Sequence, residues 1–75
     1  MASVDENIAA GLRMHRALKK ASQKAVAEAI GTNQSTISSW ENSGGIGFAE
    51  AWAAADYYNC SLDELAGRIW PPKEC

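Results

Sequence analysis

The order of apolar and polar residues along the chain predicts a series of short helices. From about residue 5 to residue 65, apolar side chains recur three or four positions apart, a spacing that keeps them on one face of an α-helix. Glycine, asparagine and serine separate these stretches, and they favour helix ends and turns. We therefore expect an all-α fold with five helices, at about residues 5–20, 23–30, 34–42 and 48–58, and from Ser61 onward.

The inward faces of these helices predict one small core. In the first helix, Ile8, Ala9, Leu12 and Ala17 form the inward stripe, and we expect His15 at the surface or at its boundary. Over the whole chain, the predicted core consists of Leu12, Val26, Ala27, Ile30, Ile37, Trp40, Phe48, Trp52, Leu62 and Leu65.

The sharpest local pattern is a pair of short helices joined by a tight turn. Ser22 opens the first helix and Gly31 ends it, because glycine can take the positive φ that a sharp turn requires. Asn33 is the expected N-cap of the second helix, whose inner face holds Ile37 and Trp40. Short hydrogen-bonding side chains occupy its other face. This arrangement is a helix-turn-helix.

Five short segments of this helix pair carry the residue types of a known family at that family's spacing. These segments are Ser22-Gln23, Ala27-Glu28, Ile30-Gly31, Ser35-Thr36-Ile37-Ser38 and Trp40-Glu41-Asn42. In these segments the chain resembles the phage repressor and Cro type of DNA-binding domain, also called the XRE-like family. A looser likeness extends from Ile8 to Arg68, since residues 61–65 resemble the opening of that family's last helix. The resemblance implies a compact five-helix domain of the phage-repressor type.

The resemblance also implies which side chains meet DNA bases. The second helix of such a pair enters the major groove with its N-terminal residues against the base edges. Gln34 suits the edge of adenine, because its amide donates and accepts hydrogen bonds in one plane. The residues expected to contact bases are Gln34, Ser35, Ser39 and Ser38. The alternative for each of them is ordinary solvated helix surface.

Phosphate contacts are expected at helix N-termini, whose first backbone N–H groups lack partners. By resemblance, Gln23 meets a phosphate and its side chain can also brace Gln34. Asn42 takes a similar role after the recognition helix. The expected phosphate-contacting residues are Gln23, Asn42, Ser22 and Thr36. The alternatives are a plain polar first-turn residue for Gln23 and a boundary position for Thr36.

The resemblance further implies an ion pair between the first and third helices. Arg16 stands where the family has an arginine that pairs with the glutamate after the recognition helix, here Glu41. The alternative is a solvated arginine. Removing one partner of a mostly buried pair costs about 3 kcal/mol or more.

The charge of the chain bears on how it would bind DNA. The net charge is −2, whereas nucleic-acid binders usually present a basic surface. Residues 1–30 carry five basic and three acidic side chains, a balance of +2, and residues 31–75 carry two basic and six acidic ones, a balance of −4. Any basic face must come from the first helix and the start of the second. The glycine-rich stretch at 42–47 lacks the basic residues that the family often carries there.

Composition limits the other classes of function. The 75 residues suit one domain, with its core at about 5–68 and a C-terminal tail at 69–75. No apolar run approaches the ~20 residues of a membrane span, and the N-terminus has no export signal, so we expect a cytoplasmic location and no membrane partner. Since no metal-ligand cluster or catalytic motif stands out, we expect no enzyme activity, metal, cofactor or small-molecule substrate.

These observations favour sequence-specific binding of double-stranded DNA. The expected function is that of a transcriptional regulator of phage or mobile-element type, such as a repressor, acting by occupancy of a near-palindromic operator. The alternative is a helix-turn-helix protein-interaction module such as an antitoxin component, which the acidic second half favours. Ile69 and Trp70 follow the last helix and would either complete the core or anchor a homodimer.

Overall fold

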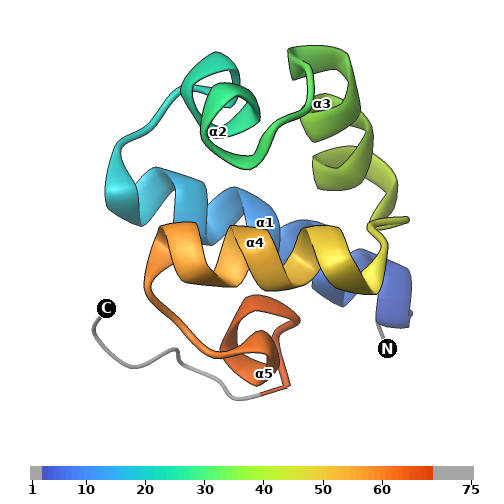
Figure 1. Ribbon diagram of the computed structural model, residues 1–75. Coiled ribbons are helices and arrows are strands. Elements are labelled where there is room, and N and C mark those ends of the chain that lie inside the picture. The colour runs from blue at the N-terminus through green and yellow to red at the C-terminus, as the bar shows by residue number, and fades with distance from the viewer. Residues whose placement is uncertain (1–2, 69–75) are drawn as a thin grey trace.

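The computed structural model describes residues 3–68, and these form α-helices and connections without a strand (Figure 1). The helices are α1 (Val4–Lys19), α2 (Gln23–Ile30), α3 (Gln34–Ser43), α4 (Phe48–Tyr58) and α5 (Leu62–Leu65). The prediction of an all-α, five-helix fold is confirmed. Ile69 and Trp70, for which two roles were expected, lie outside the described residues.

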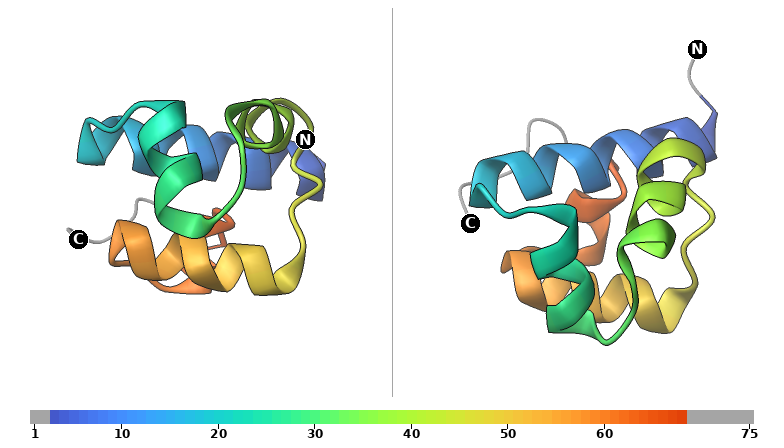
Figure 2. Two further views of the ribbon diagram at one scale, coloured as in Figure 1. Left: turned by 45° about the horizontal axis from the view of Figure 1, so that its top comes forward. Right: turned by 90° about the horizontal axis from the view of Figure 1, so that it is seen from above.

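The two longest helices, α1 and α4, form the middle of the molecule. In Figure 1, α4 crosses in front of α1, with α2 and α3 above them and α5 below. Seen from above, α3 lies against the N-terminal half of α1, beside α2 (Figure 2). Helix α1 contacts α3, α4 and α5, so it joins the two sides of the fold. The pair α2 and α3 therefore occupies one side of the molecule, and α5 lies on the other.

Polar side chains begin four of the five helices. Ser3, Ser22, Asn33 and Ser61 each accept a hydrogen bond from the backbone N–H three residues on. Each bond satisfies a donor that the first turn of a helix leaves without a partner. At the start of α5, the backbone N–H of Ser61 also donates to the Glu64 carboxylate at 3.0 Å, which completes a capping box.

Gly44 ends α3 one residue later than the sequence predicted. Its φ is +75°, in the left-handed region that glycine takes without strain. A Cβ atom at this position would lie 2.2 Å from the backbone oxygen of Asp5 in α1. The end of α3 therefore packs directly against the backbone of the first turn of α1.

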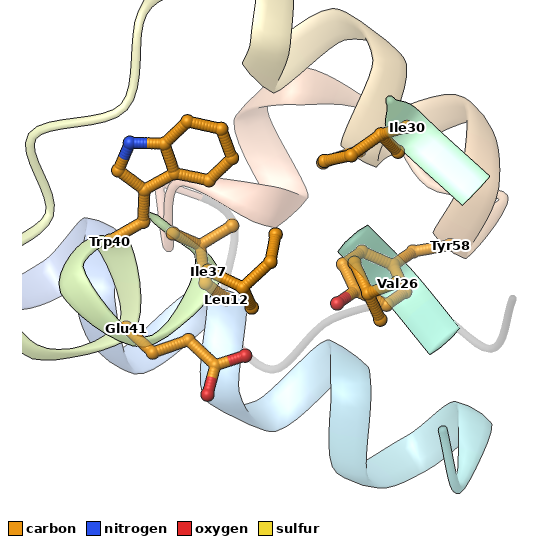
Figure 3. Close-up of a pocket in the computed structure, with 8 residues that line it drawn as sticks. Leu12, Val26, Ile30, Ile37, Trp40, Glu41 and Tyr58 are labelled. Atoms are coloured by element: carbon orange, nitrogen blue, oxygen red, sulfur yellow. The ribbon is translucent and has the colours of Figure 1, made fainter. Parts of the chain in front are cut away.

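The core lies between α1, α2, α3 and α4, and α5 adds Leu65 to it. Its buried apolar cluster consists of Leu12, Val26, Ala27, Ile37, Ala54, Ala55, Tyr58 and Leu65. Ile30, Trp40 and Leu62 pack against this cluster and are partly buried. Figure 3 shows several of these side chains around a gap of about 10 Å³, which is no larger than a single water needs.

The prediction that Phe48 and Trp52 belong to the core was wrong. Their exposed fractions are 74% and 60%. The inward stripe of α4 consists of Ala51, Ala54, Ala55 and Tyr58, which stand at helical spacing i, i+3, i+4 and i+7. Small alanines let α4 approach α1 and α2 closely. Phe48 and Trp52 form a neighbouring stripe that faces outward.

The expectations for the second half of α1 also require correction. His15, predicted at the surface or at its boundary, is 2% exposed, and Ala17, predicted inward, is exposed. His15 lies one turn after Leu12 on the inward face, its Nδ1 is 2.8 Å from the backbone oxygen of Gly11, and its ring centroid is 6.1 Å from that of Tyr58. Among the described residues, its Nε2 has no hydrogen-bond partner. The histidine therefore occupies a core position.

Candidate nucleic-acid interface

The candidate interface begins with the turn between α2 and α3. The N–H of Gly31, whose φ is +80°, donates to the backbone oxygen of Ala27, and Asn33 then caps α3. A Cβ at Gly31 would meet nothing within 4 Å, so its left-handed φ, and not crowding, makes glycine suitable here. The turn sets α3 beside α2, and the N-terminal end of α3 lies at the top edge of the molecule in Figure 1.

The outer face of α3 carries the side chains predicted to meet bases. Gln34, Ser35 and Ser39 are exposed, and Ser38 is half-buried. Ile37, on the opposite side of the helix, is 3% exposed within the core. The core therefore supports α3 from behind. The side-chain amide and hydroxyl groups of α3 remain accessible to a groove of DNA.

Side chains near the two ends of α3 form hydrogen bonds within the protein. The Thr36 hydroxyl donates to the Asn33 side chain at 3.0 Å, which ties Thr36 to the cap. At the other end, the Asn42 amide donates to Ser38 at 3.4 Å, and the Ser43 hydroxyl donates to the backbone oxygen of Ser39 at 2.8 Å. Thr36 and Asn42 lie at opposite ends of α3, as contacts to two separate phosphates would require.

Glu41 joins α3 to α1 and α2. Its side chain is 4% exposed, and Figure 3 shows its carboxylate directed toward α1. Arg16 donates to the two carboxylate oxygens through Nε at 2.7 Å and Nη2 at 2.9 Å, a bidentate pair. The Gln23 side-chain amide donates to the same carboxylate at 3.1 Å. The Gln34 amide in turn donates to Gln23 at 3.5 Å.

This network reaches from the protein interior to Gln34 at the surface. Arg16, Glu41, Gln23 and Gln34 form a continuous chain of polar contacts from α1 to the first turn of α3. The hydrogen bond to Glu41 raises the pKa of Arg16 above its ordinary value, because the bond favours the charged form of the guanidinium. Burial raises the pKa of nearby Tyr58 well above its usual range.

The start of α2 holds the remaining predicted phosphate contacts. The Ser22 hydroxyl accepts from the Ala25 N–H at 3.0 Å, so it already serves one of the N–H groups of this helix end. Gln23 is half-buried because of its bond to Glu41. Both residues sit at a helix N-terminus, where the remaining N–H groups and the helix dipole favour an anion.

The basic side chains contribute unequally to this face. Arg16 is neutralised by Glu41, and the Lys19 ammonium lies 4.7 Å from the centroid of the Tyr57 ring. The Arg13 guanidinium donates to the backbone oxygen of Glu41, a contact that nothing in the sequence pattern indicated. The exposed basic residues of α1, α2 and the connection between them are Arg13, Lys19, Lys20 and Lys24.

Comparisons with known proteins support the same region. The family model described as helix-turn-helix matches residues 12–65, which is more than half of the chain. No curated protein and no solved structure matched the chain.

Within residues 3–68, the structure has no helix long and apolar enough to cross a membrane. The same residues contain no group of three or more potential metal ligands placed to hold an ion.

Proposed function

The chain belongs to the XRE-like helix-turn-helix family of DNA-binding regulators, and from this premise we propose that it recognises a specific operator sequence and regulates transcription by occupying it. The observation that carries the proposal is the exposed polar face of α3. Its first turn presents Gln34 and Ser35, and Ile37 and Glu41 anchor the helix from behind. The helix would enter the major groove with this turn against the base edges.

The proposed base contacts differ in how strongly they discriminate between bases. Gln34 pairs with adenine through its amide, whose nitrogen lies 3.5 Å from the side-chain oxygen of Gln23. Ser35, Ser39 and Ser38 each offer one hydroxyl, which discriminates weakly between bases. We therefore assign most of the sequence preference to Gln34.

The proposed phosphate contacts flank the recognition helix. Gln23 and Ser22 hold one phosphate at the N-terminus of α2, while Thr36 and Asn42 approach the backbone from α3. Few exposed basic side chains surround these positions, so the affinity should fall with salt along a shallow slope.

Two copies of the chain would bind one operator. Two recognition helices reach successive major grooves when they stand about 34 Å apart, one turn of the duplex. The operator would then be a near-palindrome, bound by a homodimer or by two copies that meet on DNA. A repressor of phage or mobile-element type acts in this way.

Selection of duplexes from a random DNA pool at low salt tests the proposal. The wild-type chain should enrich a near-palindromic motif, and Gln34→Ala should lose the preference for one base in each half-site, at a cost of about 1–3 kcal/mol. Asp56→Ala, an exposed change on α4, serves as the matched control and should enrich the same motif. Failure to enrich any duplex would exclude a DNA reader. If Gln34→Ala keeps the same base preference, Gln34 is not a base-reading residue, but the proposal of DNA recognition stands.

A second candidate function is a protein-interaction module such as an antitoxin component. The acidic balance of residues 31–75 and the exposed aromatic side chains of α4 favour it. Weak binding to random-sequence DNA together with tight binding to a protein would support this candidate over the operator-binding role.

A further inference from the structure

The last turn of α3 has a backbone carbonyl whose partner comes from another helix. The N–H of Gly44 donates to the oxygen of Trp40 at 2.8 Å, and the next carbonyl along the chain, that of Glu41, accepts a hydrogen bond from the Arg13 guanidinium. The last carbonyls of a helix lack partners within it. Arg13, on α1, therefore caps the C-terminal end of α3.

This bond leaves the charge of Arg13 uncompensated. A backbone carbonyl is neutral, and no carboxylate among residues 3–68 forms an ion pair with Arg13. The residue is exposed. A guanidinium has five N–H donors in a planar fork, and one donor directed at the carbonyl leaves the others for an anion. Arg13 therefore offers water, or a ligand, a cation of the shape that suits a phosphate.

The cap places this cation where α3 would leave a groove of DNA. Helix α3 has 10 residues and is about 15 Å long, whereas the major groove is about 12 Å wide and about 8.5 Å deep. With the first turn of α3 against the base edges, its last turn would lie near the phosphates that border the groove. Asn42, exposed and next to Glu41 in the chain, is the phosphate contact already proposed at this end.

Without Arg13, the C-terminal end of α3 would be unfavourable for an anion. It is the negative end of the helix dipole, and Gly44 packs on the first turn of α1, which carries two acidic side chains. Residues 42–47 contain no basic side chain. Lys20 ends α1 and Lys24 lies in the first turn of α2, near the other proposed phosphate site. Arg13 thus supplies positive charge where the chain needs it to approach a phosphate.

We propose that Arg13 binds a DNA phosphate at the C-terminal end of α3, while the Glu41 carbonyl holds its guanidinium beside Asn42. This inference rests on the proposed operator binding and assigns it a further contact residue. The contact would carry no base preference of its own, because phosphates are alike at every position, but it would fix how α3 lies in the groove. The alternative is a cap with a structural role alone, which differs in its dependence on salt.

The salt dependence of DNA affinity tests the proposal. Arg13→Met keeps most of the length of the side chain and removes its charge. Loss of one phosphate contact makes the plot of log K against log salt shallower by about 0.9, so the advantage of the wild type should shrink about 3.5-fold between about 0.05 and 0.2 M salt. The loss should be equal for the selected duplex and for a random-sequence duplex. Arg13→Lys, which keeps the charge, should restore most of the slope.

Arg68→Met is the matched control. It removes the same charge beside α5, on the side of the molecule away from α2 and α3 (Figure 1), so it should keep the affinity and the slope of the wild type. Far-ultraviolet circular dichroism shows whether each variant is folded at the assay temperature. If Arg13→Met does not fold, Arg13→Gln takes its place with the same expected slope, because its amide keeps a donor for the carbonyl.

The outcomes separate this contact from the proposed function. A neutral Arg13 variant with the slope of the wild type overturns the proposal even if its affinity falls, because the side chain is then a cap only. An equal change in Arg68→Met also overturns it, since net charge would explain the effect. If the wild type binds no duplex, the proposed function fails and the contact with it. If the wild type binds random-sequence DNA but enriches no motif, operator recognition fails, while a shallower slope on that DNA supports the contact.

Discussion

Breaking the Arg16–Glu41 pair from the arginine side should strongly destabilise the fold. Arg16→Met keeps the length of the side chain and removes the two hydrogen bonds to the carboxylate, at 2.7 and 2.9 Å, and one to the backbone oxygen of Ala21, at 3.2 Å. Glu41, 4% exposed, then keeps only the Gln23 amide among the side-chain donors of this network. A carboxylate is left in the interior without its counter-charge.

The size of the effect follows from burial. Breaking a buried ion pair by removing one partner costs about 3–5 kcal/mol. The Arg16 side chain is 27% exposed, so solvent screens part of the interaction and we take the lower end, about 3 kcal/mol. A domain of this length has a total stability of roughly 4–11 kcal/mol. The melting temperature should therefore fall by about 12–24 °C, at about 4–8 °C for each kcal/mol.

Urea unfolding followed by far-ultraviolet circular dichroism measures the free energy of each variant. The double variant Arg16→Met, Glu41→Leu removes the buried charge together with its partner, so it should recover most of the loss and show a coupling energy of about 2 kcal/mol. A loss below about 1 kcal/mol in Arg16→Met, or a double variant no more stable than the sum of the two single changes, would contradict the reasoning.

Three further predictions concern the turn, the tryptophans and alkaline pH. Gly44→Ala should lower the free energy of unfolding in urea by at least about 2 kcal/mol, because the new Cβ would clash with the α1 backbone and the residue has a positive φ. The control Gly45→Ala, whose Cβ would meet nothing within 4 Å, should change that free energy by less than about 0.5 kcal/mol. Trp40→Ala, which removes a ring packed on the core, should cost about 3 kcal/mol, and Trp52→Ala should cost less than about 1 kcal/mol; equal losses would refute the orientation of α4. Because burial raises the pKa of Tyr58 in the fold, the unfolded chain loses the phenolic proton first, near pH ~10, and stability should decline above that pH by up to about 1.4 kcal/mol per pH unit. Tyr58→Phe should remove this part of the decline, and an identical slope in both proteins would show that Tyr58 does not cause it.

The helix ends were predictable because their signals are local. Ser22, Gly31 and Asn33 act through bonds to backbone groups a few residues away, and the structure forms the expected caps and turn at these positions. The outward placement of Gln34 and Ser35 follows from the same helical period. Their contacts with DNA depend on a partner molecule and stay predictions.

The orientation of α4 was not predictable from periodicity. Apolar residues surround nearly the whole of this helix, so the pattern cannot distinguish the stripe with Phe48 and Trp52 from the stripe with Ala54 and Ala55. Packing selects the alanine stripe, because small side chains allow the closest approach to α1 and α2. The burial of His15 likewise depends on tertiary neighbours.

The position of the charges explains how a chain with a net charge of −2 is compatible with DNA binding. On α2 and α3 the acidic side chains are Glu28 and Glu41, and Arg16 already compensates Glu41. Among the described residues, most of the remaining negative charge lies on α4, on α5 or at the start of α1. The molecule measures 30 × 24 × 21 Å, and exposed charges are largely screened beyond about 8 Å at physiological salt. DNA at α3 would therefore experience mainly the local, weakly basic surface.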